Sequence, residues 1–357
     1  MNDELDLIAR IRPEAGPYSE RAKLAARREL LTTPRRRRPY GIAIAGFVAA
    51  AAAASVVAVN VSAPGGQTRG GIGTPAVVAL PKIAKMSAVE VLGKAARAVT
   101  DLRPRDDQFV KVRSQTMYGA FMLPATSEQT GEKVQESRYL NRTMRTIWLS
   151  ADGTRDGSLR IEHLEPRAYP GWPMPEEAHA DKGPEWMPLP ACGAVPATAY
   201  TELKKLPADA EGMRRHLYAE DRNKNSADVE AWRAVGDLLR ETYIPAAQRA
   251  ALYEAAATIP GVTVTENAED AAGRKGLGVG RVSNGVREEI IFDPASHELL
   301  GERGIVVDET EAKSPVGSLV ASTAQLTVSV VDEAPKVVEE AHEKGAPASG
   351  CGEAKAG

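Results

Sequence analysis

The longest apolar pattern in the chain covers residues 40–61, YGIAIAGFVAAAAAASVVAVNV, and contains no charged residue. Because a helix rises 1.5 Å per residue, roughly 20 apolar residues cross a hydrocarbon core of ~30 Å. A helix also bonds its own backbone groups, as lipid requires. The pattern therefore predicts one transmembrane helix over residues 40–61.

The charges around this stretch predict its orientation. Four arginines stand shortly before it, Arg35, Arg36, Arg37 and Arg38, whereas the other flank has only Arg69 nearby. By the positive-inside rule, residues 1–39 form a cytoplasmic tail and the chain after residue 61 is extracytoplasmic. A cleaved signal peptide and a buried alanine-rich core helix stay open as alternatives. The long charged segment before the stretch, and the length of the stretch itself, favour a retained span.

Beyond a glycine- and proline-rich linker at residues 62–81, helical and strand periodicities predict an extracytoplasmic α+β domain over residues 82–331. Its first helix starts at the capping-box pattern of Ser87 and Glu90. Apolar residues then recur at helical spacing, at Val91, Ala95, Val99 and Leu102. Residues 332–357, rich in Glu, Lys, Ala and Gly, are predicted to be a disordered tail.

Strand periodicity dominates two parts of this domain. Early strands are predicted over 108–117, 138–150 and 158–164, with a hairpin turn at Asp152-Gly153. The last third predicts a meander that turns tightly at Asn284-Gly285. The strands of the meander are expected at residues 262–265, 277–282, 286–292, 299–307 and 319–330. The last of them is expected to close a curved antiparallel sheet packed on helices.

Three more helices are predicted between the two sets of strands. Asp209 caps the first, Asn225 or Ser226 caps the second, and Pro245 opens the third. Their inward faces are expected to carry Met213, Leu217, Trp232, Val235, Leu239, Tyr243, Leu252, Tyr253 and Ala256. The proline-rich stretch before them, residues 165–196, is predicted to be an irregular loop. It is either a flap that packs Trp172 and Trp186 against the sheet or a lid that contacts a ligand.

The amino-acid composition limits the possible classes of protein but does not indicate a reaction. The 357 residues leave room for one large or two small domains besides the span, and the net charge of −3 gives no reason to expect a nucleic-acid partner. The run from Arg35 to Arg38 is expected to contact anionic membrane lipid. The sequence leaves open whether its two cysteines, Cys192 and Cys351, form a disulfide or remain thiols.

Motifs with a known chemical mechanism do not emerge from the chain. The five histidines show no HxxxH or HExxH pairing, which makes metal chemistry improbable. Residues 273–280, GRKGLGVG, lack the P-loop spacing and predict a strand with glycines on one face, where another element approaches closely. Asp293, His297 and Glu298 are a candidate acid–base cluster, but Asp-Pro-x-Ser is ordinary turn chemistry. No catalytic, cofactor-binding or metal-ligating residue is predicted, and no cofactor.

Several passages together resemble a known family. They are ELDLIARIRPE, the arginine-flanked span, LPAD with its helix, ALYEAAATIPGV and IIFDPASHELLGERGIV. The chain resembles actinobacterial single-pass membrane proteins of uncharacterised function, often encoded beside extracytoplasmic-function sigma factors. Its order of elements is also similar to periplasmic sensor and lipoprotein-carrier folds of the RseB and LolA type, which bind lipid or partner protein. The His/Cys zinc motif of many anti-sigma domains does not occur in residues 1–39.

The leading hypothesis is a non-enzymatic, single-pass membrane protein. Its extracytoplasmic domain would bind a ligand, lipid or partner, and its tail would couple to a cytoplasmic regulator. One alternative is a membrane-tethered lipid or lipoprotein carrier, which requires an apolar cavity between the sheet and the helices. The other is an envelope enzyme that uses residues 165–196 as a lid and Asp293 with His297 as acid and base.

Protease protection in intact protoplasts tests the orientation, with an epitope tag at each end of the chain. We expect the protease to remove the C-terminal tag and to leave the N-terminal tag intact, because the arginine run holds residues 1–39 inside. Digestion of the N-terminal tag alone would place the large domain in the cytoplasm. Loss of both tags from the membrane fraction would show that residues 40–61 are not an anchor.

Overall fold

The computed structural model describes residues 77–122, 125–126, 133–134, 136–179, 183–219 and 225–337. The predicted span at residues 40–61, the tail before it and most of the predicted C-terminal tail lie outside these ranges. Within them, no helix has both the length and the apolar character needed to cross a membrane.

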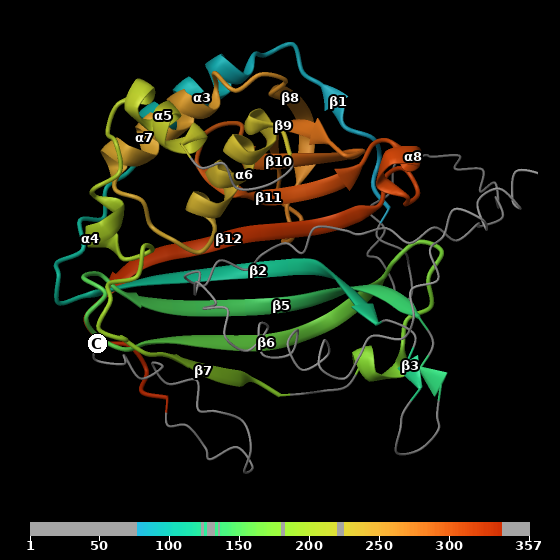
Figure 1. Ribbon diagram of the computed structural model, residues 1–357, viewed down its shortest axis with the longest axis horizontal. Coiled ribbons are helices and arrows are strands. Elements are labelled where there is room, and N and C mark those ends of the chain that lie inside the picture. Colours follow the sequence, from blue (N-terminus) through green and yellow to red (C-terminus); the bar gives the residue numbers. More distant parts are fainter. Residues whose placement is uncertain are drawn as a thin grey trace, which may run out of the picture. The chain divides into compact units, whose positions relative to one another are not determined.

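A large antiparallel sheet forms the framework, which confirms an α+β fold (Figure 1). Ten strands are hydrogen-bonded side by side in the order β1-β8-β9-β10-β11-β12-β2-β5-β6-β7. In that order they are β1 (Lys82–Ile83), β8 (Thr263–Glu269), β9 (Lys275–Ser283), β10 (Val286–Phe292), β11 (Leu299–Val306), β12 (Leu319–Val331), β2 (Phe109–Met122), β5 (Ser137–Ser150), β6 (Gly157–Ala168) and β7 (Glu185–Leu189). A separate pair joins β3 (Ala125–Thr126) to β4 (Lys133–Val134).

The last strand, β12, lies inside the sheet and does not close it as predicted. It pairs with β11 on one side and with β2 on the other, so that Thr323 faces Glu302 in one strand and Thr116 in the other. β12 thus joins the C-terminal meander to the long N-terminal strands. The predicted turn at Asn284-Gly285 is confirmed, because both residues have positive φ, 50° and 73°.

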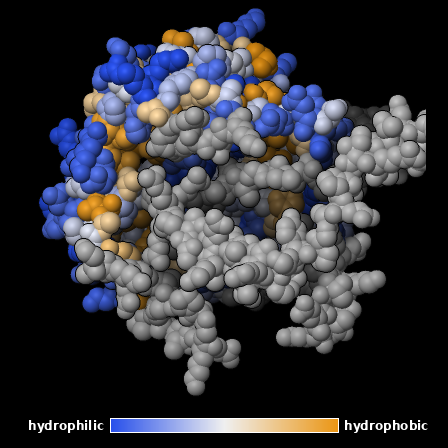
Figure 2. Space-filling model, viewed as in Figure 1, coloured by the Kyte–Doolittle hydropathy of each residue, from blue (hydrophilic) through white to orange (hydrophobic). Residues whose placement is uncertain are grey.

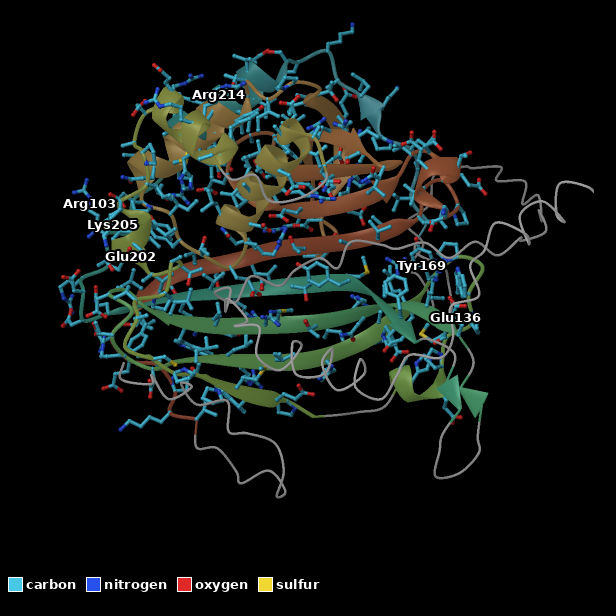
Figure 3. The ribbon with its side chains drawn as sticks, viewed as in Figure 1. Arg103, Glu136, Tyr169, Glu202, Lys205 and Arg214 are labelled. Atoms are coloured by element: carbon cyan, nitrogen blue, oxygen red, sulfur yellow. The ribbon has the colours of Figure 1, made fainter. Side chains whose placement is uncertain are left out.

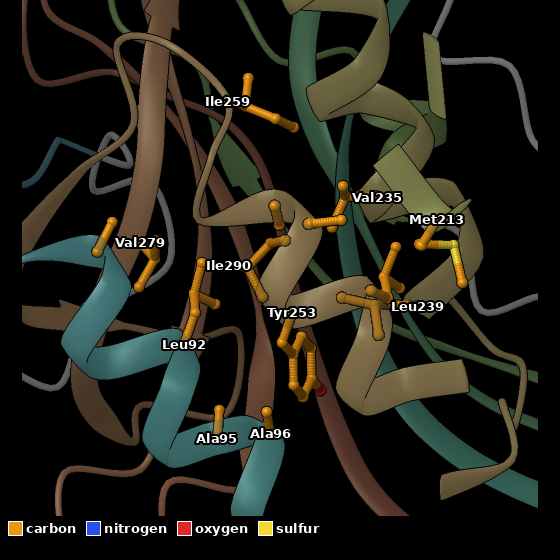
Figure 4. Packing of buried hydrophobic residues seen from close by; sticks show 14 of the residues in the cluster. Leu92, Ala95, Ala96, Met213, Val235, Leu239, Tyr253, Ile259, Val279 and Ile290 are labelled. Carbon is orange, nitrogen blue, oxygen red and sulfur yellow. The ribbon is translucent and has the colours of Figure 1, made fainter. Parts of the chain in front are cut away.

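Helices cover one face of the sheet over the meander (Figure 1). The longer ones are α3 (Ala88–Arg97), α5 (Ala210–Tyr218), α6 (Ala227–Leu239) and α7 (Ala246–Ala256); the short ones are α4 (Tyr200–Leu203), α8 (Glu309–Ala312) and a 3₁₀ turn, η1 (Glu176–His179). The buried core beneath them includes Leu92, Met213, Val235, Tyr253, Val279 and Ile290 (Figure 4). The outer side of this helical layer is mainly hydrophilic (Figure 2).

The predictions of where helices begin agree with the structure better than the predictions of where they end. Ser87 Oγ accepts a hydrogen bond from the backbone N–H of Glu90, and Asp209 accepts one from Gly212. However, α3 ends at Arg97, so Val99 and Leu102 lie beyond the helix. The hydroxyl of Tyr243 binds the backbone that follows α3. It accepts a hydrogen bond from Leu102 N at 2.6 Å and donates one to Thr100 O at 2.9 Å.

The proline-rich stretch at residues 165–196 is more regular than predicted. β6 continues to Ala168, and β7 pairs with β6 although it contains Pro188, which an edge strand tolerates. Trp186 on β7 stacks on Trp148 with ring centroids 5.9 Å apart and stays 42% exposed. Trp172 packs against a small buried cluster around Tyr169, which lies at the opposite end of the long strands from α4 (Figures 1 and 3).

A buried ion cluster occupies the sheet face opposite the helices. On β10, Ile290 and Phe292 face the helical core, so the alternation of a strand turns Glu289 to the other side. Arg287 Nε and Arg303 Nε each donate to the carboxylate of Glu289 at 2.6 Å, and none of the three side chains is more than 4% exposed. A carboxylate this deeply buried is stable only when such partners surround it.

The predicted glycine face of β9 makes room for this cluster. A Cβ on Gly278 would lie 2.6 Å from Thr265 Oγ1 and 2.8 Å from the carboxyl carbon of Glu289. These separations are far below van der Waals contact, so another side chain does approach closely, as expected of a strand glycine.

Gly278→Ala tests how strictly the cluster is packed. We expect it to lower the free energy of unfolding by about 2 kcal/mol, because the new methyl group overpacks the space of Glu289. Gly93→Ala in α3 is the control, since its Cβ would meet only Arg97 Nη1 at 3.6 Å. That change should raise stability by about 1 kcal/mol through helix propensity. Urea unfolding of the full chain, followed by tryptophan fluorescence, measures both; equal effects of the two variants would contradict the packing argument.

Candidate functional site

A small cleft lies where the helical layer ends, between the C-terminus of α6 and strands β11, β12 and β2. It is partly open to solvent, and its enclosed space of about 20 Å³ is enough for one bound water. Its walls are formed by Val112, Ser114, Thr116, Leu239, Arg240, Glu241, Leu299, Gly301, Glu302, Thr323, Ala324 and Gln325.

The first cluster of charged side chains in this cleft is centred on Glu241. Arg145 on β5 donates two hydrogen bonds to the carboxylate of Glu241, from Nε at 2.6 Å and from Nη2 at 3.0 Å. Ser114 on β2 adds a third from its hydroxyl at 2.8 Å. The side chains of Arg145 and Glu241 are each 13% exposed. Two-point binding of this kind fixes both the position and the orientation of the carboxylate.

The backbone at this position is unusual. α6 ends at Leu239, Arg240 is extended, and Glu241 adopts the left-handed conformation at φ 53°. A residue with a Cβ pays a conformational cost there, which glycine would avoid. The bonds from Arg145 and Ser114 offset that cost and hold a charged side chain in the wall of the cleft.

A second charge group lies beside the first. Arg240 donates from Nη2 to Glu302 at 2.7 Å and from Nη1 to Asp237 at 2.9 Å. The carboxylate of Glu302 raises the pKa of Arg240, so this guanidinium stays charged. Arg240 and Glu302 are each 16% exposed, which shields the pair from solvent screening.

Two further titratable groups adjoin this network. Burial raises the pKa of Tyr118 to about 12, against the field of Arg240. Burial also raises the pKa of Glu288, and Arg233 opposes that change. The guanidinium of Arg233 lies 4.0 Å from the Glu288 carboxylate.

The charged groups in the wall of the cleft bond to one another. The carboxylates of Glu241 and Glu302 are each paired with an arginine, so their charges are neutralised within the protein. An arginine does not give up its proton in proteins. Within the described ranges, no group of three or more His, Cys, Asp and Glu residues is placed to hold a metal ion.

The acid–base candidates from the sequence lie elsewhere, in the turn between β10 and β11. Asp293 accepts hydrogen bonds from the backbone N–H groups of Ala295 and Ser296, both at 2.8 Å, and these bonds lower the pKa of Asp293. His297 Nδ1 lies 3.2 Å from the backbone oxygen of Ala295. The backbone N–H of Glu298 donates to Ser296 Oγ at 3.3 Å, and Ser296 Oγ donates to the Glu298 carboxylate at 3.5 Å. The three side chains therefore belong to a turn.

The structure shows the state of one of the two cysteines. Cys192 is disulfide-bonded. The sequence contains one other cysteine, Cys351, which lies outside the described ranges.

Sequence reasoning missed the cleft, although one signal was present. Arg145 occupies an inward position in the alternation of β5, on the same face as Ile147 and Leu149. A charged residue on an apolar face needs a partner, but the partner Glu241 is 96 residues away in the chain. Nothing local indicates that these two residues meet.

Comparison with protein-family models and with curated proteins finds no match for this chain. The resemblance to actinobacterial single-pass membrane proteins therefore stays a prediction.

A double-mutant cycle of Arg145→Met and Glu241→Gln measures the clamp. We expect Arg145→Met alone to lower the free energy of unfolding by about 3 kcal/mol, because it leaves a carboxylate buried without its partner. The double variant should recover part of that loss, with a coupling of about 2 kcal/mol.

The matched control is the exposed pair of Arg215 and Glu211 on α5, whose side chains are 68% and 83% exposed. The cycle of Arg215→Met and Glu211→Gln should show weak coupling, since exposed ion pairs contribute little. Equal coupling in the two cycles would show that the cleft pair is an ordinary surface contact.

Proposed function

We propose that residues 82–331 form the extracytoplasmic ligand-binding domain of a single-pass membrane protein that acts by binding and not by catalysis. The observation that carries this proposal is the cleft in which Arg145 and Ser114 hold Glu241, with Arg240 and Glu302 beside them. A concave site on which several polar and charged side chains converge is the usual form of a small-molecule site.

The position of the cleft in the fold supports this function. The helices bury the meander strands, as the core residues Val264, Val279 and Ile290 show. Beyond α6, the same face of β2 and β5 carries polar side chains, among them Thr116 and Thr143, whose hydroxyls are 2.7 Å apart. A ligand can therefore reach the sheet where the helical layer stops.

The proposed membrane arrangement follows from the sequence pattern. Residues 40–61 would cross the bilayer once, with Arg35, Arg36, Arg37 and Arg38 at the cytoplasmic lipid surface. Residues 1–39 would then couple ligand binding outside to a cytoplasmic regulator, in line with the resemblance to proteins encoded beside sigma factors.

The two alternatives receive less support. A lipid or lipoprotein carrier requires an apolar cavity between helices and sheet, whereas that interface holds a continuous buried core around Leu92, Met213 and Leu252. An envelope enzyme that uses Asp293 and His297 requires their side chains in a cleft, whereas both belong to an ordinary turn.

Ligand-observed NMR on the detergent-solubilised full chain tests the binding function. A library of small polar compounds would be screened by saturation transfer against the wild type and two variants. Gln325→Trp fills the cleft, because Gln325 lines it. Thr327→Trp is the matched control, since Thr327 pairs with Arg113 beyond the bulge and is exposed.

We expect some compounds to bind the wild type and the Thr327→Trp variant and to lose binding with Gln325→Trp, by about tenfold or more, which corresponds to 1.4 kcal/mol. A screen without any binder would contradict the proposed function. Binding that survives Gln325→Trp would place the site elsewhere.

A further inference from the structure

Cys192 lies at one end of the sheet, beside its edge strand. It follows the last residue of β7 by three positions, is exposed, and is disulfide-bonded. The backbone N–H of its neighbour Ala191 donates a hydrogen bond to the carboxylate of Asp156 at 2.8 Å, and Asp156 directly precedes β6. The disulfide therefore attaches another segment to the point where β6 begins and β7 ends.

The chain leaves the sheet at this same end. β12 ends at Val331, which faces Phe109 at the start of β2, and β5 ends and β6 begins beside them (Figure 1). The next residue, Asp332, is held there, because its carboxylate accepts hydrogen bonds from Gln108 Nε2 at 2.8 Å and from Arg105 Nη2 at 3.2 Å. The C-terminal segment thus starts in line with the strand ends that lead to Cys192.

The remaining length of chain is ample for this distance. β7 is the fourth strand from β12 in the order of the sheet, and neighbouring strands lie about 4.8 Å apart, so about 20 Å separates their ends. The one other cysteine of the sequence, Cys351, comes 19 residues after Asp332. An extended segment of that length spans about 60 Å. Cys351 can therefore reach Cys192 with chain to spare.

From this geometry we infer that Cys192 pairs with Cys351 and that the disulfide holds β7 on the sheet, as a redox-sensitive strap. The strap consists of residues 333–350, which follow the strand ends from β12 to β7. This inference concerns a part of the protein away from the cleft and is independent of the proposed ligand-binding function.

The contacts of β7 explain why such a strap matters. β7 is hydrogen-bonded to one neighbour, β6, and its Pro188 has no N–H to donate. Its residues 185–187 are exposed. Trp186 stacks on Trp148, which is 8% exposed. Without the disulfide, these contacts alone hold β7, so it should open more often and uncover Trp148 and the outer edge of β6. An uncovered strand edge is a site where a strand of another chain can pair.

The switch between the two states is thiol–disulfide exchange. Cys192 is exposed, so a dithiol reductant can reach the bond. One thiolate of the reductant attacks a sulfur of the disulfide, and its second thiol then displaces that sulfur. The protein disulfide gains two electrons and two protons and becomes two thiols, while the dithiol becomes a disulfide. Outside the cytoplasm, a disulfide oxidant removes the same two electrons and two protons and restores the bond.

Peptide mapping by mass spectrometry tests the pairing on the full chain, solubilised in detergent and kept free of reductant. Free thiols are blocked with N-ethylmaleimide before digestion. We expect one linked pair of peptides, which contain Cys192 and Cys351, from a protein that runs as a monomer on a non-reducing gel. Blocking of both thiols before reduction, or a covalent dimer, would overturn the inference.

Hydrogen–deuterium exchange, also read by mass spectrometry, tests the strap. Dithiothreitol should raise the exchange rate of the β7 amides about tenfold and leave that of β10, inside the sheet, unchanged. Cys351→Ser should show the fast exchange of β7 without dithiothreitol and should not respond to it. Ser349→Ala, two residues away, is the matched control and should behave like the wild type.

Two results of this exchange experiment overturn the inference. Equal exchange of β7 in the oxidised and reduced chains would show that the disulfide joins two segments without holding the strand. Equally faster exchange in β10 would show a general loss of stability instead of a local release. Both results leave the proposed ligand-binding function standing, because neither measurement depends on a ligand.

Discussion

The fold depends on a carboxylate that the sheet itself encloses. Glu289 is buried on the face of β10 opposite the helices, and Arg287 and Arg303 bind one of its oxygens each. Its side chain fits because Gly278 on the neighbouring strand has no Cβ in that space. A slip of one residue would turn Glu289 into the helical core and Ile290 out of it. The ion cluster and the apolar core therefore specify the same register for β9, β10 and β11, from opposite faces of the sheet.

The cleft follows from the way this meander is extended. β12 continues the sheet from β11 to β2, so the long N-terminal strands lie beside the meander although most of the chain separates them. The helices pack against the meander strands through the buried core, and α6 ends above β11 and β12. At that end the chain turns through the left-handed Glu241, which reaches across to Arg145 on β5. A small cleft at the border of the helical layer is the result, and the charged side chains in its wall are paired within the protein.

Much of the local structure was predictable because it depends on neighbouring residues. Asn284-Gly285 specifies its hairpin through the φ angles that these residues tolerate. Ser87 and Asp209 cap their helices through bonds to residues three positions on. The candidate site was not predictable in this way. Its two ion pairs join residues 96 and 62 positions apart, and its most strained residue, Glu241, looks in the sequence like any polar residue after a helix.

The sequence by itself determined the alternation of helices and strands, the turn positions, the α+β class and the glycine-lined face of β9, because periodicity and backbone preference act over a few residues. It also carries the apolar stretch and the arginine run on which the membrane hypothesis rests. Only the tertiary structure decided that β12 is a central strand, that part of the proline-rich stretch pairs as an edge strand, and that Arg145 meets Glu241. These features depend on pairing between distant strands, whose energy comes from burial and from charge neutralisation in the assembled sheet.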